Sequence, residues 1–111
     1  MKLDFNEDGW KGMTADRATE LVSHLPLNIR KLEILEAKFG VKFAKALIER
    51  VGQCKKLKHL FLYGISCGDV DEGEELGVRM AEVISANVTI EKIWLWNTYF
   101  LVVNNVNPWG E

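Results

Sequence analysis

The sequence predicts an α/β fold: a short solenoid whose parallel sheet is covered by helices on one side, the convex one. Two observations favour this fold. An apolar signature of strand type recurs about every thirty residues, and segments with helical periodicity lie between its copies. The length of 111 residues, with 48% hydrophobic and 27% charged residues, is typical of one soluble domain. We therefore expect a single domain over residues 1–111.

The repeated signature consists of apolar residues, and its last two positions are two residues apart. It occurs as Leu3-x-Phe5, Ile29-x-x-Leu32-x-Ile34, Leu57-x-x-Leu60-x-Leu62 and Ile90-x-x-Ile93-x-Leu95. The spacing is 29 residues from Leu3 to Leu32, 28 from Leu32 to Leu60 and 33 from Leu60 to Ile93. This alternation is typical of a strand that buries one face. It predicts strands near 2–6, 30–35, 58–63 and 91–96.

Three segments between the signatures carry apolar residues at helical spacing, which predicts helices near 14–25, 40–52 and 73–86. Thr14 is a suitable N-cap for the first helix, and Pro26 follows its end. Gly52 is expected to stop the second helix. The stretch Asn87-Val-Thr89 has the spacing of a glycosylation site but is better interpreted as the turn into the last strand. Because every crossover contains a helix, we expect parallel strands, right-handed connections and helices on one side.

Two passages carry a family resemblance. They are Met80-Ala-Glu-Val-Ile-Ser-Ala-Asn-Val-Thr-Ile-Glu-Lys-Ile-Trp-Leu-Trp-Asn97, and residues 40–51 followed by Leu57-Lys-His-Leu-Phe-Leu62. Both resemble the helix-to-strand passage of ribonuclease-inhibitor-type leucine-rich repeats, and the resemblance covers residues 1 to about 97. It implies a short, degenerate leucine-rich-repeat solenoid that binds another protein. The family's asparagine, three residues after the last strand leucine, is replaced here by Asp8, Ala37, Ile65 and Thr98. An ordinary two-layer α/β domain with similar βα units is the alternative fold.

Side chains alternate along a strand, so the residues between the core positions should face away from the helices. The expected rows, strand by strand, are Lys2, Lys31, His59 and Lys92, then Asp4, Glu33, Phe61 and Trp94, then Asn6, Leu35, Tyr63 and Trp96. The four aromatic residues would form one block. Each has roughly 150 to 250 Å² of surface, more in total than the few hundred Å² that a monomer normally exposes as one patch. We therefore expect something to cover them.

Three covers are considered: the C-terminal tail 98–111, a second copy of the chain, or a distinct partner protein. The predicted function is a protein–protein interaction module that binds another protein through its concave sheet face. The predicted partner-binding residues are Phe61, Tyr63, Trp94, Trp96, Glu33, Leu35, His59, Lys31 and Lys92. The alternative is an architectural subunit that forms a homodimer or larger homo-oligomer, or docks permanently into an assembly. It would use the C-terminal edge, where 99–103 is uncharged with high β-propensity.

The sequence contains no recognisable catalytic, cofactor or metal motif. The Gly-rich stretch 64–73 lacks the Lys-Ser/Thr ending of a phosphate cradle, and Met80 occupies the place of a calcium-binding Glu. His24, His59, Cys54 and Cys67 have no zinc spacing. A pair of Cys67 with His59 lacks an orienting third group. We expect no enzymatic activity, no cofactor and no metal.

The charge balance favours neither a nucleic acid nor an anionic membrane as partner. Fourteen Lys and Arg against sixteen Asp and Glu give a net charge of -2. A basic rim for RNA or an acidic partner is conceivable, but solvated lysines are the preferred interpretation; its residues would be Lys31, Lys55, Lys56, Lys58, His59 and Lys92. Without an export signal or a long apolar run, we expect a cytoplasmic protein with no membrane partner and with its cysteines reduced.

Overall fold

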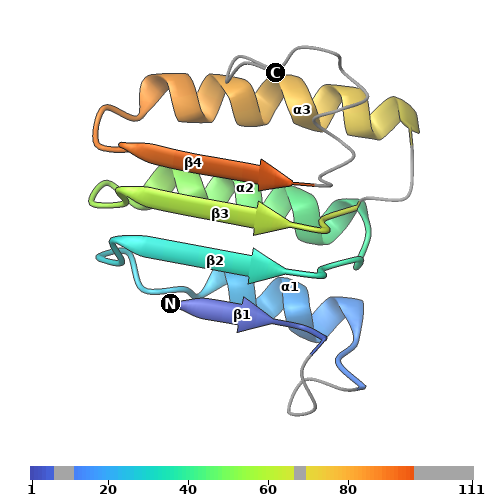
Figure 1. The fold of residues 1–111 in the computed structure, drawn as a ribbon. Coiled ribbons are helices and arrows are strands. Elements are labelled where there is room, and N and C mark those ends of the chain that lie inside the picture. The colour runs from blue at the N-terminus through green and yellow to red at the C-terminus, as the bar shows by residue number, and fades with distance from the viewer. Residues whose placement is uncertain (7–11, 67–69, 97–111) are drawn as a thin grey trace.

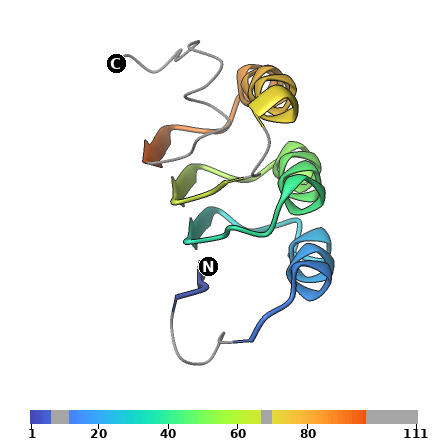
Figure 2. The same cartoon turned by 90° about the vertical axis from the view of Figure 1, so that its right-hand side faces the viewer.

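The computed structural model describes residues 1–6, 12–66 and 70–96, in which four strands alternate with three helices. In chain order these are β1 (Lys2–Asp4), α1 (Ala15–Ser23), β2 (Lys31–Leu35), α2 (Val41–Gln53), β3 (His59–Tyr63), α3 (Val70–Ala86) and β4 (Lys92–Trp96). The strands form one parallel sheet in the order β1-β2-β3-β4 (Figure 1). All three helices lie on the same side of it (Figure 2). The prediction of an α/β fold with a parallel sheet and one-sided helices is confirmed.

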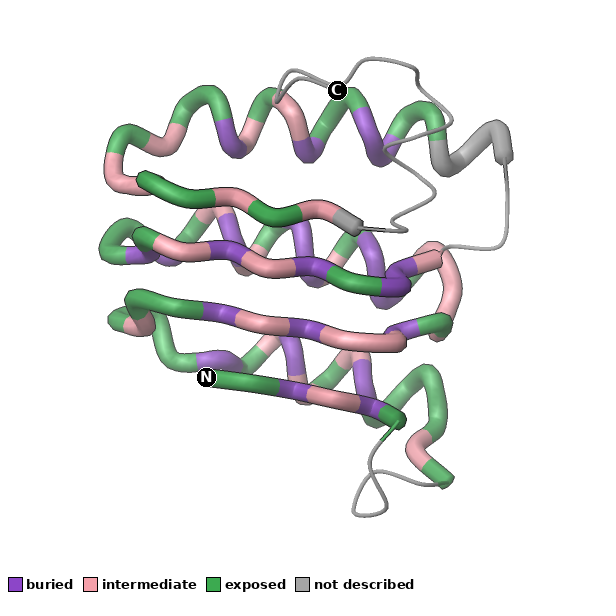
Figure 3. Tube along the Cα trace, in the orientation of Figure 1, coloured by how far each residue is buried: buried purple, intermediate pink, exposed green. Residues whose placement is uncertain are grey.

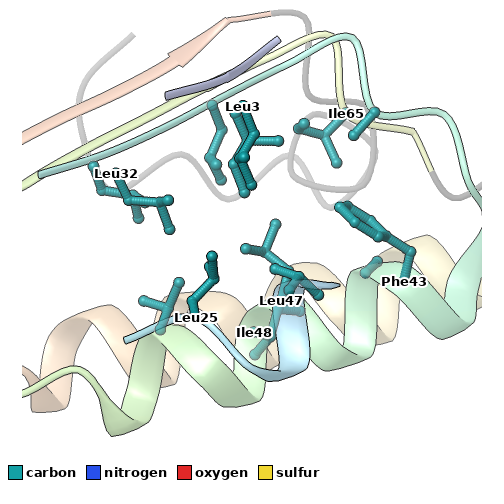
Figure 4. Close-up of a cluster of buried hydrophobic side chains, with 14 of the residues drawn as sticks. Leu3, Leu25, Leu32, Phe43, Leu47, Ile48 and Ile65 are labelled. Carbon is teal, nitrogen blue, oxygen red and sulfur yellow. The ribbon is translucent and has the colours of Figure 1, made fainter. Parts of the chain in front are cut away.

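The hydrophobic core lies between the sheet and the helices. Along β2 and β3 every second side chain is buried, as the alternating colours of Figure 3 show; these residues are Leu32, Ile34, Leu60 and Leu62. They meet Phe43, Leu47 and Ile48 of α2, which point toward the sheet in Figure 4. Burying a side chain of this size stabilises the fold by about 1.5 to 3 kcal/mol. The strand residues predicted to face the helices therefore do so.

The same backbone hydrogen bonds recur where β3 and β4 begin. The carbonyl oxygen of Arg30 accepts from the amides of Lys58 at 2.8 Å and His59 at 3.0 Å. One unit later, the carbonyl oxygen of Lys58 accepts from the amides of Glu91 at 2.8 Å and Lys92 at 3.1 Å. The repeated pattern fixes the register of β2, β3 and β4 at one edge of the sheet.

The turn from α3 into β4 is held by Asn87, as predicted. Its Oδ1 atom accepts hydrogen bonds from the amides of Thr89 at 2.8 Å and Ile90 at 3.2 Å. The Thr89 hydroxyl donates to the carbonyl oxygen of Leu57 at 2.8 Å, which ties this turn to the one before β3. Asn87 therefore has a structural role in the connection.

The observed helix bounds lie within three residues of the predicted ones. Thr14 caps α1 as predicted, because its hydroxyl accepts a hydrogen bond from the Arg17 amide at 3.2 Å. The prediction that Gly52 stops α2 is wrong, since this helix continues to Gln53. A Cβ atom at Gly52 would lie 3.4 Å from Cγ1 of Val83. Gly52 therefore lies on the side of α2 that faces α3, and an added Cβ would make an ordinary contact there.

The pairing of β1 differs from the prediction by two residues. Lys2 is opposite Glu33, and Asp4 is opposite Leu35. The predicted rows are therefore wrong for the first strand, and Asn6 follows the end of β1 instead of pairing with Leu35. With only three residues, β1 offers a short pattern, and a slip of two residues leaves every side chain on the same face. The alternation alone does not distinguish the two registers.

Several predictions concern residues outside the described ranges. They include the tail 98–111, Cys67, and the positions Asp8 and Thr98 where the family resemblance places asparagine. Within the described residues, no helix combines the length and apolar character that crossing a bilayer requires.

Candidate functional site

The candidate site is the face of the sheet that points away from the helices, which we call the open face. The register of β2, β3 and β4 arranges its residues in three rows: Lys31, His59 and Lys92, then Glu33, Phe61 and Trp94, then Leu35, Tyr63 and Trp96. Over these three strands each row agrees with the predicted one. All nine predicted partner-binding positions therefore lie together on three adjacent strands.

The exposure of these side chains supports the assignment of the face. Trp94 is 54% exposed and Tyr63 is 37% exposed, whereas the neighbouring Leu60 and Leu62 are fully buried. Phe61 is half-buried at the centre of the face. The side chain of Trp96 lies outside the description, so only its backbone position in the third row is known. β3 therefore places its two leucines in the core, while Tyr63 of β3 and Trp94 of β4 are on the outside.

Charged and aromatic side chains are in contact around Phe61. The ammonium nitrogen of Lys31 lies 5.5 Å from the centre of the Phe61 ring, within the range of a cation–π interaction. It also lies 3.8 Å from a carboxylate oxygen of Glu33. The His59 ring meets Phe61 edge to face, with 6.3 Å between ring centres. Lys31 and His59 thus contact one aromatic ring, and Glu33 pairs with the lysine above it.

The sequence predicts no catalytic group, and the one pair considered, Cys67 with His59, includes a residue outside the described ranges. His59 packs edge to face on Phe61. Cys54 is a free, buried thiol at the C-terminal end of α2, and its Sγ atom lies 3.8 Å from the carbonyl oxygen of Pro26. Burial raises the pKa of this thiol, and the nearby Arg50 opposes the shift. Across the described part of the chain, no three His, Cys, Asp or Glu side chains are placed to hold one metal ion.

A depression that the sequence did not predict lies between β1 and α1 at the end of the stack. It has a volume of about 720 Å³. Its lining residues are Met1, Leu3, Met13, Arg17, Glu20, Leu21, His24, Leu25 and Pro26. Among the described residues, β1 and α1 have a neighbouring strand and helix on one side only, which leaves this depression at the end of the stack. The sequence signal that could have predicted the depression is the apolar residues of the first strand and helix, because no earlier unit of the repeat precedes them in the described residues.

Comparison of the chain with protein-family models, with curated proteins and with solved structures gives no match.

Proposed function

We propose that this protein is an interaction module that binds a partner protein through the open face. One observation carries the proposal: Phe61, Tyr63 and Trp94 lie on two adjacent strands, and Trp94 and Tyr63 remain substantially exposed. Aromatic side chains are the most frequent anchors of protein interfaces, because they bury a large area and lose little conformational freedom. A surface of this kind on a sheet fits a partner that covers the aromatic residues.

The architecture we propose for this module is a short leucine-rich-repeat solenoid with the open face as its concave side. Supporting it are two turns of similar conformation after consecutive strands. Glu36 follows β2 with a φ of 58°, and Gly64 follows β3 with a φ of 70°. The Glu36 amide donates to the carbonyl oxygen of Tyr63 at 2.7 Å, and the Ser66 amide donates to that of Ala37 at 3.2 Å. These backbone hydrogen bonds join the turns of the two units where the family has an asparagine.

Specificity in this proposal comes from the charged residues around the aromatic centre, Lys31, Glu33, His59 and Lys92. Charges at the rim of an interface select the partner and its orientation more than they add affinity. The module acts by binding and has no catalytic role. Cys54, as a free and buried thiol, fits the reducing cytoplasm that we propose as its location.

A site-specific photo-crosslinking experiment tests this proposal. A photoreactive phenylalanine analogue replaces Trp94 in one variant and the exposed Arg79 of α3 in the control. In native extract, the variant at position 94 should give a discrete adduct that mass spectrometry identifies, and the variant at position 79 should not. The identified protein is then purified, and Trp94→Ala should weaken its binding at least tenfold, as expected of an aromatic hot spot.

Two results would contradict the proposal. Equal adducts from positions 94 and 79 would mean that the open face has no preference. An adduct of two copies of the 12.7 kDa chain, together with a dimer in size-exclusion chromatography with light scattering, would support the architectural alternative instead.

A further inference from the structure

The charges of this chain are unevenly distributed along the fold. Three segments lead from a helix into the next strand and include its first residue; they are residues 24–31, 54–59 and 87–92. These segments contain six of the fourteen Lys and Arg residues but only one of the sixteen Asp and Glu residues. We call the six the basic edge; they are Arg30, Lys31, Lys55, Lys56, Lys58 and Lys92.

The topology brings the basic edge to one side of the sheet. In a parallel sheet all strands begin at the same edge, and here the backbone hydrogen bonds join the three segments directly. All six side chains are exposed. Lys58 pairs with Glu91 at 3.9 Å, and Lys31 pairs with Glu33 at 3.8 Å. Within the described ranges, the other four basic residues of this edge have no ion pair.

Helix stabilisation does not account for this concentration of charge. Basic residues stabilise a helix when they lie in its last turn, where the helix dipole is negative. The last turns of α1 and α3 contain none, and that of α2 contains only Arg50, which belongs to the helix itself. The basic residues are instead in the connections and at the strand starts. There they adjoin the first row of the open face.

We infer that the partner of the open face is an acidic protein segment, whose carboxylates meet the basic edge while its apolar side chains cover Phe61 and Trp94. This inference rests on the function proposed above and specifies its partner. Lys31 and Lys92 flank His59 in the first row, two strands apart, which corresponds to roughly 10 Å at the usual strand spacing. A peptide in the polyproline II conformation spans about that distance with three residues, and its side chains three positions apart lie on the same face. The segment therefore carries acidic residues about three positions apart.

The position of Glu33 favours an acidic protein segment over a nucleic acid. Glu33 lies in the second row beside Phe61, where a base stacked on this ring would bring a phosphate close to the carboxylate. A uniformly charged polyanion would meet this repulsion, whereas a segment with acidic residues at one end and apolar residues at the other would not. The rest of the chain also carries an excess of acidic residues, because the basic edge lies within a protein of net charge -2.

Fluorescence anisotropy on the full chain tests this inference. The probe is a labelled peptide with two glutamates three positions apart, followed by Trp and Leu, and the matched probe has glutamine in place of glutamate. The glutamate peptide should bind more tightly, and its advantage should shrink with added salt, because exposed ion pairs are screened. The charge reversals Lys55→Glu and Lys92→Glu together change four units of charge and should weaken its binding about fifteenfold, at roughly a factor of two per unit.

The control variant combines Lys42→Glu and Lys45→Glu on the exposed side of α2, which changes the net charge equally. It should alter binding of the glutamate peptide less than about twofold, because both residues lie near the start of α2, at least about 15 Å along the helix axis from Lys55 and beyond the screening length at physiological salt. An equal loss with both variants would mean that only net charge matters and would overturn the inference.

Three other outcomes would also overturn it. If both peptides bind equally and Trp94→Ala abolishes this binding, the open face remains a binding site but its partner is not acidic. Tighter binding of a single-stranded oligothymidine, with the same sensitivity to the two reversals at the basic edge, would assign the edge to nucleic acid. Failure of both peptides and the oligothymidine to bind would remove the basic edge as a recognition element, and the crosslinking at position 94 would then decide separately on the open face.

Discussion

The assignment of Trp94 to the surface and Leu60 to the core makes a quantitative prediction about two alanine variants. Trp94 is 54% exposed, so just under half of its roughly 150 to 250 Å² is covered in the folded chain. At about 25 cal/mol per Å², reduced for the partly compact unfolded state, its loss should lower the free energy of unfolding by about 1 to 2.6 kcal/mol. Leu60 has no exposed surface, and Leu60→Ala should lower it by about 3 kcal/mol or more.

Urea unfolding followed by far-UV circular dichroism measures both free energies, since this signal does not depend on the tryptophan removed. A domain of this length is expected to have about 6 to 16 kcal/mol of stability, so Trp94→Ala should remain folded at room temperature. A larger loss for Trp94→Ala than for Leu60→Ala would refute the face assignment. Trp94 would then be a core residue, and the proposal for the open face would fail with it.

Three further predictions concern the backbone and one buried thiol. Gly64→Ala should cost about 1 to 2 kcal/mol in urea unfolding, because φ is 70° and the new Cβ would lie 2.9 Å from Oε2 of Glu36; an unchanged midpoint would contradict this. Thr14→Ala should cost about 1 kcal/mol through loss of the α1 cap, and a change below about 0.3 kcal/mol would mean the cap is unimportant. Burial, opposed by Arg50, raises the pKa of Cys54 above its ordinary 9.0, so the folded state favours the neutral thiol. The free energy of unfolding should therefore fall as pH rises past about 9, because the thiol loses its proton first in the unfolded chain. Urea unfolding should find a smaller fall for Cys54→Ala. Equal pH slopes for the two proteins would contradict the raised pKa of Cys54.

The alternation of apolar residues was sufficient to predict β2, β3 and β4 and their register, because each strand has two core residues preceded by a third apolar position. Leu57 precedes Leu60 and Leu62 in this way, and Leu57 is buried too. β1 has no residue that corresponds to Leu57, and its register was predicted two residues away from the observed pairing. A one-residue slip would expose the core, whereas a two-residue slip costs only local contacts. Periodicity therefore determined the faces of all four strands but the register of only three.

Local sequence signals were reliable where one side chain determines the geometry and unreliable where packing does. The Thr14 hydroxyl needs only the Arg17 amide of its own helix, so the start of α1 follows from the sequence nearby. Gly52 was expected to end α2, but the helix continues to Gln53 and Gly52 faces Val83 of α3. That contact involves a helix about thirty residues later in the chain and has no local signal.

The candidate site was predictable as a set of positions but not as a set of contacts. Alternation placed Lys31, Glu33 and Phe61 on one face, yet only the folded chain positions the Lys31 ammonium over the Phe61 ring and beside Glu33. In the sequence, the residues of the basic edge appear only as lysines and one arginine in different connections. Their concentration at one edge emerges once the strand order joins three connections that lie about thirty residues apart.

The way the open face is built has a consequence for how it binds. Phe61 lies between Leu60 and Leu62, both fully buried, so the backbone that carries it cannot shift without disturbing the core. Lys31 and His59 already contact its ring in the free chain. A partner therefore meets an aromatic centre that is largely ordered before binding, and less conformational entropy is lost when the complex forms. Lys92, which has no ion pair among the described residues, can still turn toward a carboxylate. Affinity should thus depend mainly on the ordered aromatic centre, and choice of partner on the adaptable charges at the edge of the sheet.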